Sequence, residues 1–172
     1  MKRACMTFIP FLFLVGCSSY PSIRSEKNVD INRFMGDWYV IANIPTFIEE
    51  GAHNAIETYK LNEDGSIATT FSFYQDSFTG EKKEYHPTGY IYDKESNAVW
   101  GMQFIWPIKS DYRILYLDED YNHTIIGRIK RDYVWIMARN PTVPEKEYEK
   151  MVQIIEQEGY DINELKKVPQ SW

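Results

Sequence analysis

The feature that most constrains this chain is a series of eight strand-like runs separated by short turns. Apolar and polar residues alternate within the runs, and turn-forming residues fill the connections, as in Asn62-Glu63-Asp64-Gly65. Connections this short join antiparallel neighbours, because parallel strands need crossovers of about a dozen residues or more. The predicted runs cover residues 37–44, 55–62, 66–74, 83–93, 97–104, 112–118, 122–129 and 132–139.

An open sheet of eight strands would leave two edges free to pair with other chains. Closing the sheet on itself removes both edges. We therefore predict an all-β fold, an eight-stranded antiparallel up-and-down barrel wide enough for one small ligand. In a closed, even-numbered meander the start of the first strand meets the end of the last. This places Trp38 beside Arg139, with the guanidinium over the indole face.

The pattern changes after the last run. Asn140-Pro141 ends the strand, Thr142 is a candidate N-cap, and Gly159 is a candidate stop. Apolar residues recur between them at helical spacing, at Tyr148, Met151, Val152 and Ile155. We predict one C-terminal α-helix packed outside the barrel.

The N-terminus carries the features of an export signal. Lys2 and Arg3 precede an apolar run, Phe8 to Leu14, which is too short to span a bilayer. It leads into Leu14-Val15-Gly16-Cys17, which looks like the lipobox of bacterial lipoproteins. That resemblance implies that Cys17 becomes the lipidated first residue, and Ser18 resembles lipoproteins sorted to the outer membrane. The alternative is an ordinary signal peptide with a chance cysteine.

Three regions follow from this interpretation. Residues 1–16 are the predicted lipoprotein signal peptide, and residues 17–29 are the lipidated cysteine and a flexible tether, because they are polar and aperiodic. Residues 30–172 are the barrel domain.

Composition excludes several functions. The net charge of −6, without a stripe of Lys and Arg, argues against a nucleic-acid partner. Cys5 would be removed and Cys17 acylated, so no thiol would remain for catalysis. The histidines His53, His86 and His123 lack the spacing of metal ligands, and no nucleotide-binding or nucleophile motif is present. We expect no enzyme activity, no metal and no cofactor.

Three motifs resemble those of the lipocalin family. Gly36-Asp37-Trp38-Tyr39 is similar to its Gly-x-Trp motif, and Ser110-Asp111-Tyr112 to its Thr-Asp-Tyr motif. The stretch from Trp135 to Pro141 resembles the third motif, whose arginine packs on the tryptophan. The structural motif residues are therefore Gly36, Trp38, Asp111, Tyr112 and Arg139.

The resemblance covers about residues 30–168 and is strongest to bacterial outer-membrane lipoprotein lipocalins and apolipoprotein D. It implies a calyx that is closed at the Trp38 end, open at the other, and holds a small hydrophobic molecule. Bacterial members are lipoproteins implicated in binding fatty acids or lysophospholipids.

Strand alternation predicts which side chains face the cavity, because every second residue of a strand points to the same side. The alternative is that the barrel is filled by its own side chains. The predicted lining residues are Val40, Ala42, Glu57, Tyr59, Trp100, Met102, Phe104, Tyr112, Ile114, Tyr116, Trp135 and Met137.

The chain differs from the lipocalins that it resembles at Glu57, where those proteins look to have a small residue such as Ala. One hypothesis is that Glu57 changes head-group preference, disfavouring a free carboxylate and favouring a zwitterionic or amine-bearing lipid. The alternative is a glutamate at the mouth, in water. The strand directions also place Phe47, Ile48, Phe78, Trp106 and Ile108 around the open end, as a rim that touches or admits lipid.

The predicted function is a lipocalin lipid-anchored in the cell outer membrane through Cys17, which binds fatty acids or lysophospholipids for transport, storage or scavenging. The sequence is also compatible with a homodimer. The alternative is an envelope structural or stress-response lipoprotein with a filled barrel and a protein partner.

Overall fold

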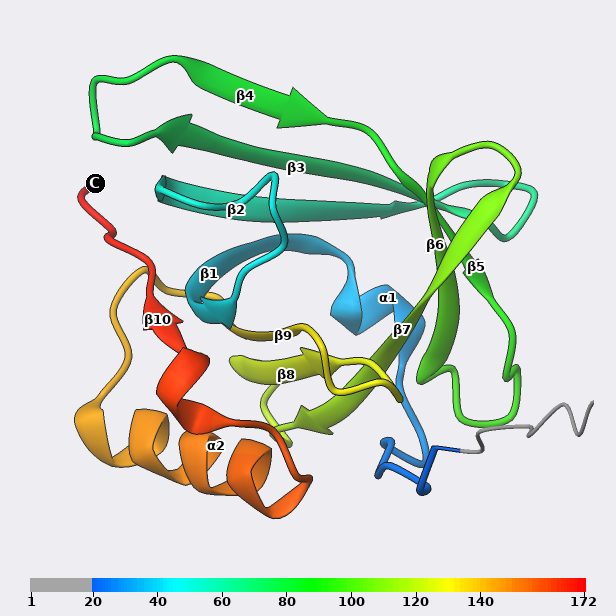
Figure 1. Cartoon of the computed structure of the whole chain (residues 1–172). Coiled ribbons are helices and arrows are strands. Elements are labelled where there is room, and N and C mark those ends of the chain that lie inside the picture. Colours follow the sequence, from blue (N-terminus) through cyan, green and yellow to red (C-terminus); the bar gives the residue numbers. More distant parts are fainter. Residues whose placement is uncertain (1–19) are drawn as a thin grey trace, which may run out of the picture.

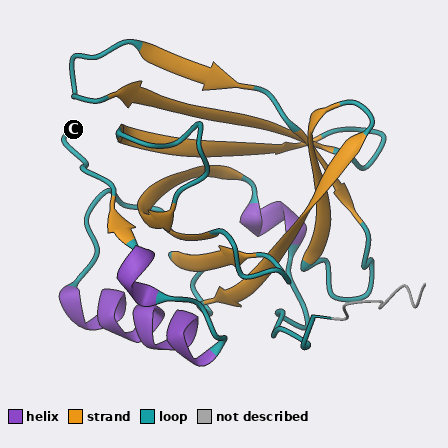
Figure 2. Ribbon diagram, viewed as in Figure 1, coloured by secondary structure: helices purple, strands orange, loops and turns teal. Residues whose placement is uncertain are grey.

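The barrel seen in the computed structural model, which describes residues 20–172, is a closed antiparallel meander (Figures 1 and 2). From β1 to β9 neighbouring strands pair in chain order, except that β3 pairs with both β4 and β5, and pairing of β1 with β9 closes the sheet. The predicted eight-stranded up-and-down barrel is confirmed. The strands are β1 (Gly36–Ile44), β2 (Ala52–Leu61), β3 (Ile67–Gln75), β4 (Lys82–Tyr85), β5 (Thr88–Ile91), β6 (Val99–Ile105), β7 (Ile108–Leu117), β8 (His123–Gly127), β9 (Val134–Ala138) and β10 (Lys166–Lys167).

Two details of the sheet differ from the prediction. The single run predicted for residues 83–93 is divided into β4 and β5, which pair in turn with β3. The division falls at His86-Pro87, because a proline has no N–H to donate to the ladder. In addition, the short strand β10 pairs with β1 near Ala42.

The closed end is built around Trp38 and Arg139. The Arg139 guanidinium carbon lies 3.8 Å from the centre of the Trp38 ring, so the predicted contact is confirmed. The same guanidinium donates hydrogen bonds to the carbonyls of Phe34, Met35 and Asp37 at 3.1, 2.8 and 2.7 Å. These bonds hold helix α1 (Ile31–Phe34) across the closed end of the barrel (Figure 1).

The lower half of the barrel is filled by side chains. Phe34 enters from α1, and its ring centre lies within 5.6 Å of the ring centres of Trp38, Tyr59 and Trp100, in tilted and edge-to-face arrangements. All four side chains are at least 98% buried. This core is the floor on which any ligand must rest.

A second apolar core lies outside the barrel, beneath helix α2 (Glu145–Gln157). Met151 and Ile155 of the helix are buried against Leu115 and Ile125 of the sheet. The predicted outer helix is confirmed, and Gly159 follows its end with a φ of 87°. Its predicted cap was wrong: the N-cap position is Pro144, not Thr142, and has no side-chain hydrogen bond. The 3-10 helix η1 (Ile162–Glu164) follows α2.

Two β-bulges change which face the ends of β1 and β7 present. The register shifts between Val40 and Ala42 in β1, and between Ile114 and Tyr116 in β7. One extra residue in a strand moves every later side chain to the other face. Ala42 and Tyr116 therefore lie in the outer core under α2 rather than inside the barrel.

Residues 20–29 were predicted as part of a flexible tether, but Ile23 packs into the outer core and Val29 into the inner core. Val29 is 99% buried, and its N–H donates to the carbonyl of Ser96 at 2.8 Å. Farther from α1, the N–H of Glu26 donates to the Ile114 carbonyl at 2.9 Å. Cys17 and the predicted signal peptide lie outside the described residues. Among residues 20–172, no helix has the length and apolarity to cross a bilayer.

Candidate functional site

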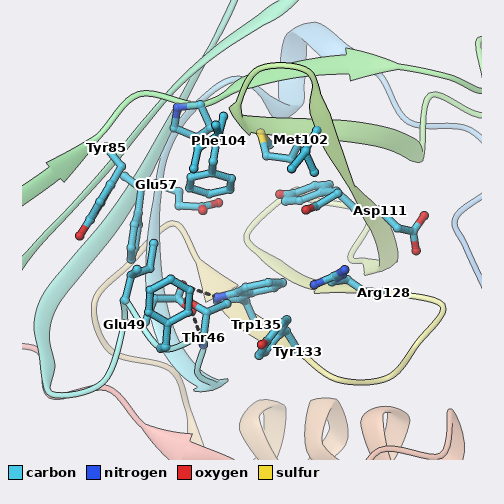
Figure 3. A pocket seen from close by; sticks show the side chains of 18 of the residues that line it. Thr46, Glu49, Glu57, Tyr85, Met102, Phe104, Asp111, Arg128, Tyr133 and Trp135 are labelled. Atoms are coloured by element: carbon cyan, nitrogen blue, oxygen red, sulfur yellow. Dashed lines mark hydrogen bonds between the residues drawn. The ribbon is translucent and has the colours of Figure 1, made fainter.

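A cavity of about 500 Å³ occupies the half of the barrel above this floor (Figure 3). This volume falls within the roughly 300–1,000 Å³ typical of small-molecule sites. Its wall is largely apolar and aromatic. The residues that line it are Thr46, Phe47, Ile48, Glu49, Glu57, Phe71, Tyr85, His86, Pro87, Met102, Phe104, Ile105, Ile108, Ser110, Asp111, Tyr112, Arg128, Tyr133 and Trp135.

Of the side chains that strand alternation predicts to line the cavity, the structure places Glu57, Met102, Phe104, Tyr112 and Trp135 on its wall. Another group points inward but belongs to the packed core below, because the large rings of the floor occupy that space. This group consists of Val40, Tyr59, Trp100, Ile114 and Met137. Ligand contact by any of these residues stays a prediction.

The prediction was wrong for Ala42 and Tyr116, which the two bulges turn outward. Ala42 packs in the outer core. The Tyr116 hydroxyl accepts a hydrogen bond from Lys150 of α2 at 2.9 Å. Neither residue lines the cavity.

The open end is surrounded by exposed apolar side chains. Phe47 is 87% exposed, Trp106 is 82% exposed and Ile108 is 67% exposed. Phe47 and Ile108 also line the cavity, together with Ile48. The cavity therefore opens between loops whose tips are apolar.

Glu57 lies deep in the cavity rather than at the mouth in water. Its backbone is paired with Trp38 and Phe71, and its carboxyl group points into the cavity (Figure 3). The Tyr59 hydroxyl donates to Glu57 Oε2 and lies 2.6 Å from the Tyr112 hydroxyl. Burial, and secondarily the charge of Glu49, raises the pKa of Glu57 to about 8. At neutral pH Glu57 is therefore mainly protonated.

Glu49 is a second buried carboxyl group that the sequence analysis missed. It lies in the loop between β1 and β2 and is 95% buried. Its Oε1 accepts from Trp135 Nε1 at 2.8 Å and its Oε2 from the Thr46 N–H at 2.7 Å (Figure 3). Burial raises its pKa, against the opposing effect of these hydrogen bonds. No local pattern could have found it, because Trp135 lies 86 positions away.

The Asp111 of the second motif has a structural role at the cavity wall. Its carboxylate pairs with Arg113 Nε at 2.9 and 3.0 Å, and Oδ2 accepts from the Ile129 N–H at 2.7 Å. It thereby joins β7 to the turn after β8. Among the described residues, no group of three His, Cys, Asp or Glu side chains could hold a metal ion.

Comparison with known proteins accords with this geometry. The model of the lipocalin-like domain matches residues 29–170. The chain belongs to the lipocalin family.

Named relatives of this lipocalin come from plants, bacteria and mammals. It is 34% identical to temperature-induced lipocalin-1 of Arabidopsis thaliana, over 84% of this chain and 81% of that protein. It is 31% identical to the outer membrane lipoprotein Blc of Citrobacter freundii, covering 89% of this chain and 88% of that protein. With mouse apolipoprotein D the identity is 28%, over 88% of this chain and 82% of the relative.

Solved structures share the fold of this lipocalin at low sequence identity. Insecticyanin from the tobacco hornworm Manduca sexta superposes with a TM-score of 0.70 at 16% identity, over 89% of this chain and 87% of that one. Membership of the family implies that the cavity binds a small hydrophobic ligand.

Proposed function

We propose that this lipocalin is a carrier that binds a single-chain lipid, a fatty acid or a lysophospholipid, in the cavity above the Trp38 floor. The cavity carries the proposal: about 500 Å³ of largely apolar space remains inside the barrel and opens at an apolar rim. An acyl chain is removed from water there, at a gain of about 0.8 kcal/mol per methylene. The carrier serves in transport, storage or scavenging of lipid rather than in catalysis.

The proposed location is the outer membrane, with the protein anchored through a lipidated Cys17. Two kinds of observation support it. The sequence before Cys17 resembles a lipobox, and relatives at 26–31% identity are named outer membrane lipoproteins. The alternative of a structural lipoprotein requires a filled barrel, and the cavity counts against that requirement.

Displacement of a fluorescent fatty-acid probe from the soluble Cys17→Ser protein tests the carrier. We expect saturable binding, competition by unlabelled fatty acid and lysophospholipid, and quenching of Trp135, which lines the cavity. The variant Trp135→Phe should lose most of the quenching. The matched variant Trp172→Phe, at an exposed C-terminal tryptophan, should keep it. Absence of saturable binding would reject the carrier and favour the alternative.

A further inference from the structure

Two carboxyl groups share one largely apolar cavity. Glu49 reaches it from the loop before β2 and Glu57 from the middle of β2. Glu49 is almost fully buried, Glu57 is partly accessible from the cavity, and the charge of Glu49 acts on Glu57. An ionised carboxyl group is costly to bury unless it is paired and hydrogen-bonded, so a ligand of opposite charge would stabilise the ionised form of either acid.

The two carboxyl groups differ in how many hydrogen bonds they accept from the protein. Glu49 accepts hydrogen bonds on both oxygens, from Trp135 and Thr46. Glu57 accepts one, on Oε2 from Tyr59, and its Oε1 has no hydrogen-bond partner among residues 20–172. The Glu57 side chain also remains partly accessible from the cavity. Glu57 is therefore the acid that is open to an incoming group.

The other charged side chains of the cavity wall each have an ionic partner, although Arg128 Nε is buried and has no hydrogen-bond partner among residues 20–172. Asp111 is neutralised by Arg113 on β7. Arg128, at the end of β8, lies 3.5 Å from Asp132, with its guanidinium 5.2 Å from the centre of the Tyr133 ring. His86, after β4, pairs with Glu84 at 3.2 Å and is largely exposed. Tyr85, Tyr112 and Tyr133 also line the cavity.

Aromatic rings complete the surroundings of Glu57. Phe71 is its backbone neighbour on β3, Tyr112 is linked to it through Tyr59, and Tyr85 and Trp135 line the same cavity. Ring faces attract cations, and an aromatic cage beside a carboxylate is how proteins recognise quaternary ammonium groups.

We propose that the ligand of this cavity carries a positively charged nitrogen, as an ammonium or quaternary ammonium group on an alkyl chain, and that Glu57 receives it at the floor. Glu49 adds to the negative potential from the wall. The proposal rests on the carrier function and names its ligand class. The cationic nitrogen lies at the floor and the alkyl chain extends towards the apolar rim. Binding ionises Glu57, whose proton passes to solvent.

Three probes with the same alkyl chain test the proposal in the Cys17→Ser protein at pH 7.5: dodecyltrimethylammonium, dodecanoate and dodecanol. We expect the ammonium to bind about tenfold or more tightly than dodecanoate. Glu57→Gln keeps the shape of the side chain and removes its charge, so it should abolish most of this preference. The matched variant Glu63→Gln, at an exposed turn position, should leave it unchanged.

The outcomes separate this inference from the carrier function. The proposal of a cationic ligand is rejected if dodecanoate binds the wild type as tightly as dodecyltrimethylammonium, or if the preference for the ammonium survives in Glu57→Gln. In either case the carrier function still stands. If none of the three probes binds, the carrier function itself fails. Should Glu57→Gln not fold, the pH profile of the wild type decides. Affinity for dodecyltrimethylammonium, whose charge does not titrate, should rise by up to about tenfold per pH unit below pH 8. A flat profile would reject the proposal.

Two sources of the charged nitrogen are distinguished with lysophospholipids. If the nitrogen belongs to a lipid head group, lysophosphatidylethanolamine should bind more tightly than lysophosphatidic acid, which lacks it. If the ligand is a free alkyl amine, dodecylammonium should bind well and both phosphate-bearing lipids poorly. Equal affinity for both lysolipids, together with equal affinity for dodecylammonium and dodecanol, would overturn the assignment.

Discussion

At the scale of single residues, the unusual feature is an acid group on the floor of an apolar cavity. A buried carboxyl group resists ionisation, since the charged form loses its hydration. Glu57 illustrates this effect: burial and the charge of Glu49 raise its pKa from 4.5 to about 8. Its protonation state therefore couples the stability of the barrel to pH.

The sign of this coupling follows from where the proton is bound. Between pH 4.5 and 8 the unfolded chain has ionised Glu57, whereas the folded chain keeps it protonated. We therefore expect the free energy of unfolding to fall as pH rises through this window, by about 1.4 kcal/mol per unit from Glu57 alone. Below pH 4.5 the contribution is constant.

Urea unfolding at pH 5.5 and pH 8 checks this expectation. Glu57→Gln should flatten the decline and be the more stable protein at pH 8, with a residual slope from Glu49, whose pKa is also raised. The exposed variant Glu63→Gln should retain the wild-type slope. A wild-type slope in Glu57→Gln would show that Glu57 is ionised when folded.

At the scale of elements, the sheet packs against one apolar core inside the barrel and another outside it, beneath α2. The inner floor, assembled from α1, β1, β2 and β6, limits the depth of the cavity. No residue of the outer core under α2 lines the cavity. The bulges in β1 and β7 separate the two cores, because they turn the ends of both strands from the interior to the helix.

Ile155→Ala in α2 tests this separation. The side chain is fully buried against Leu115 and Ile125, so its truncation should lower the free energy of unfolding by about 2–5 kcal/mol. Lipid-probe affinity of the folded protein should stay within twofold, about the effect of 0.4 kcal/mol. Gln153→Ala, on the exposed face of the same helix, should change neither quantity. A large affinity loss in Ile155→Ala would show that the cores are coupled.

At the scale of the whole molecule, the N-terminal segment and the open end lie close together. Arg131 donates to the carbonyls of Pro21 and Ser22 at 3.2 and 3.0 Å. Arg131 belongs to the turn between β8 and β9, whose flanking residues Arg128 and Tyr133 line the cavity. Residues 21 and 22 are thus held beside the mouth. Three residue steps separate Tyr20 from Cys17, and an extended chain spans at most about 11 Å over that number of residues.

This arrangement predicts that the mouth faces the membrane. In lipidated protein in vesicles, we expect fluorescence of the exposed Trp106 to shift blue and to be quenched by brominated acyl chains, because its ring enters the interface. Trp106→Phe should abolish the shift and Trp172→Phe should not. An unchanged spectrum of wild type would argue for a mouth turned away from the bilayer.

The sequence alone determined the barrel and its closed end. Hydrophobic alternation and short turns are local properties, and an even number of antiparallel strands leaves one way to close. Trp38 and Arg139, about a hundred positions apart, could therefore be paired before any coordinates. The position and outer face of α2 followed in the same way, from periodicity.

Only the tertiary structure decided which inward side chains meet a ligand. Alternation gives the face of a side chain but not whether its space is already filled, and Phe34, from outside the sheet, fills it around Trp100. The bulge between Ile114 and Tyr116 turns Tyr116 outward, and the alternation of the sequence carries no sign of that extra residue. The pairing of Glu49 with Trp135 joins a loop to a distant strand, and long-range contacts of this kind leave no trace in local pattern.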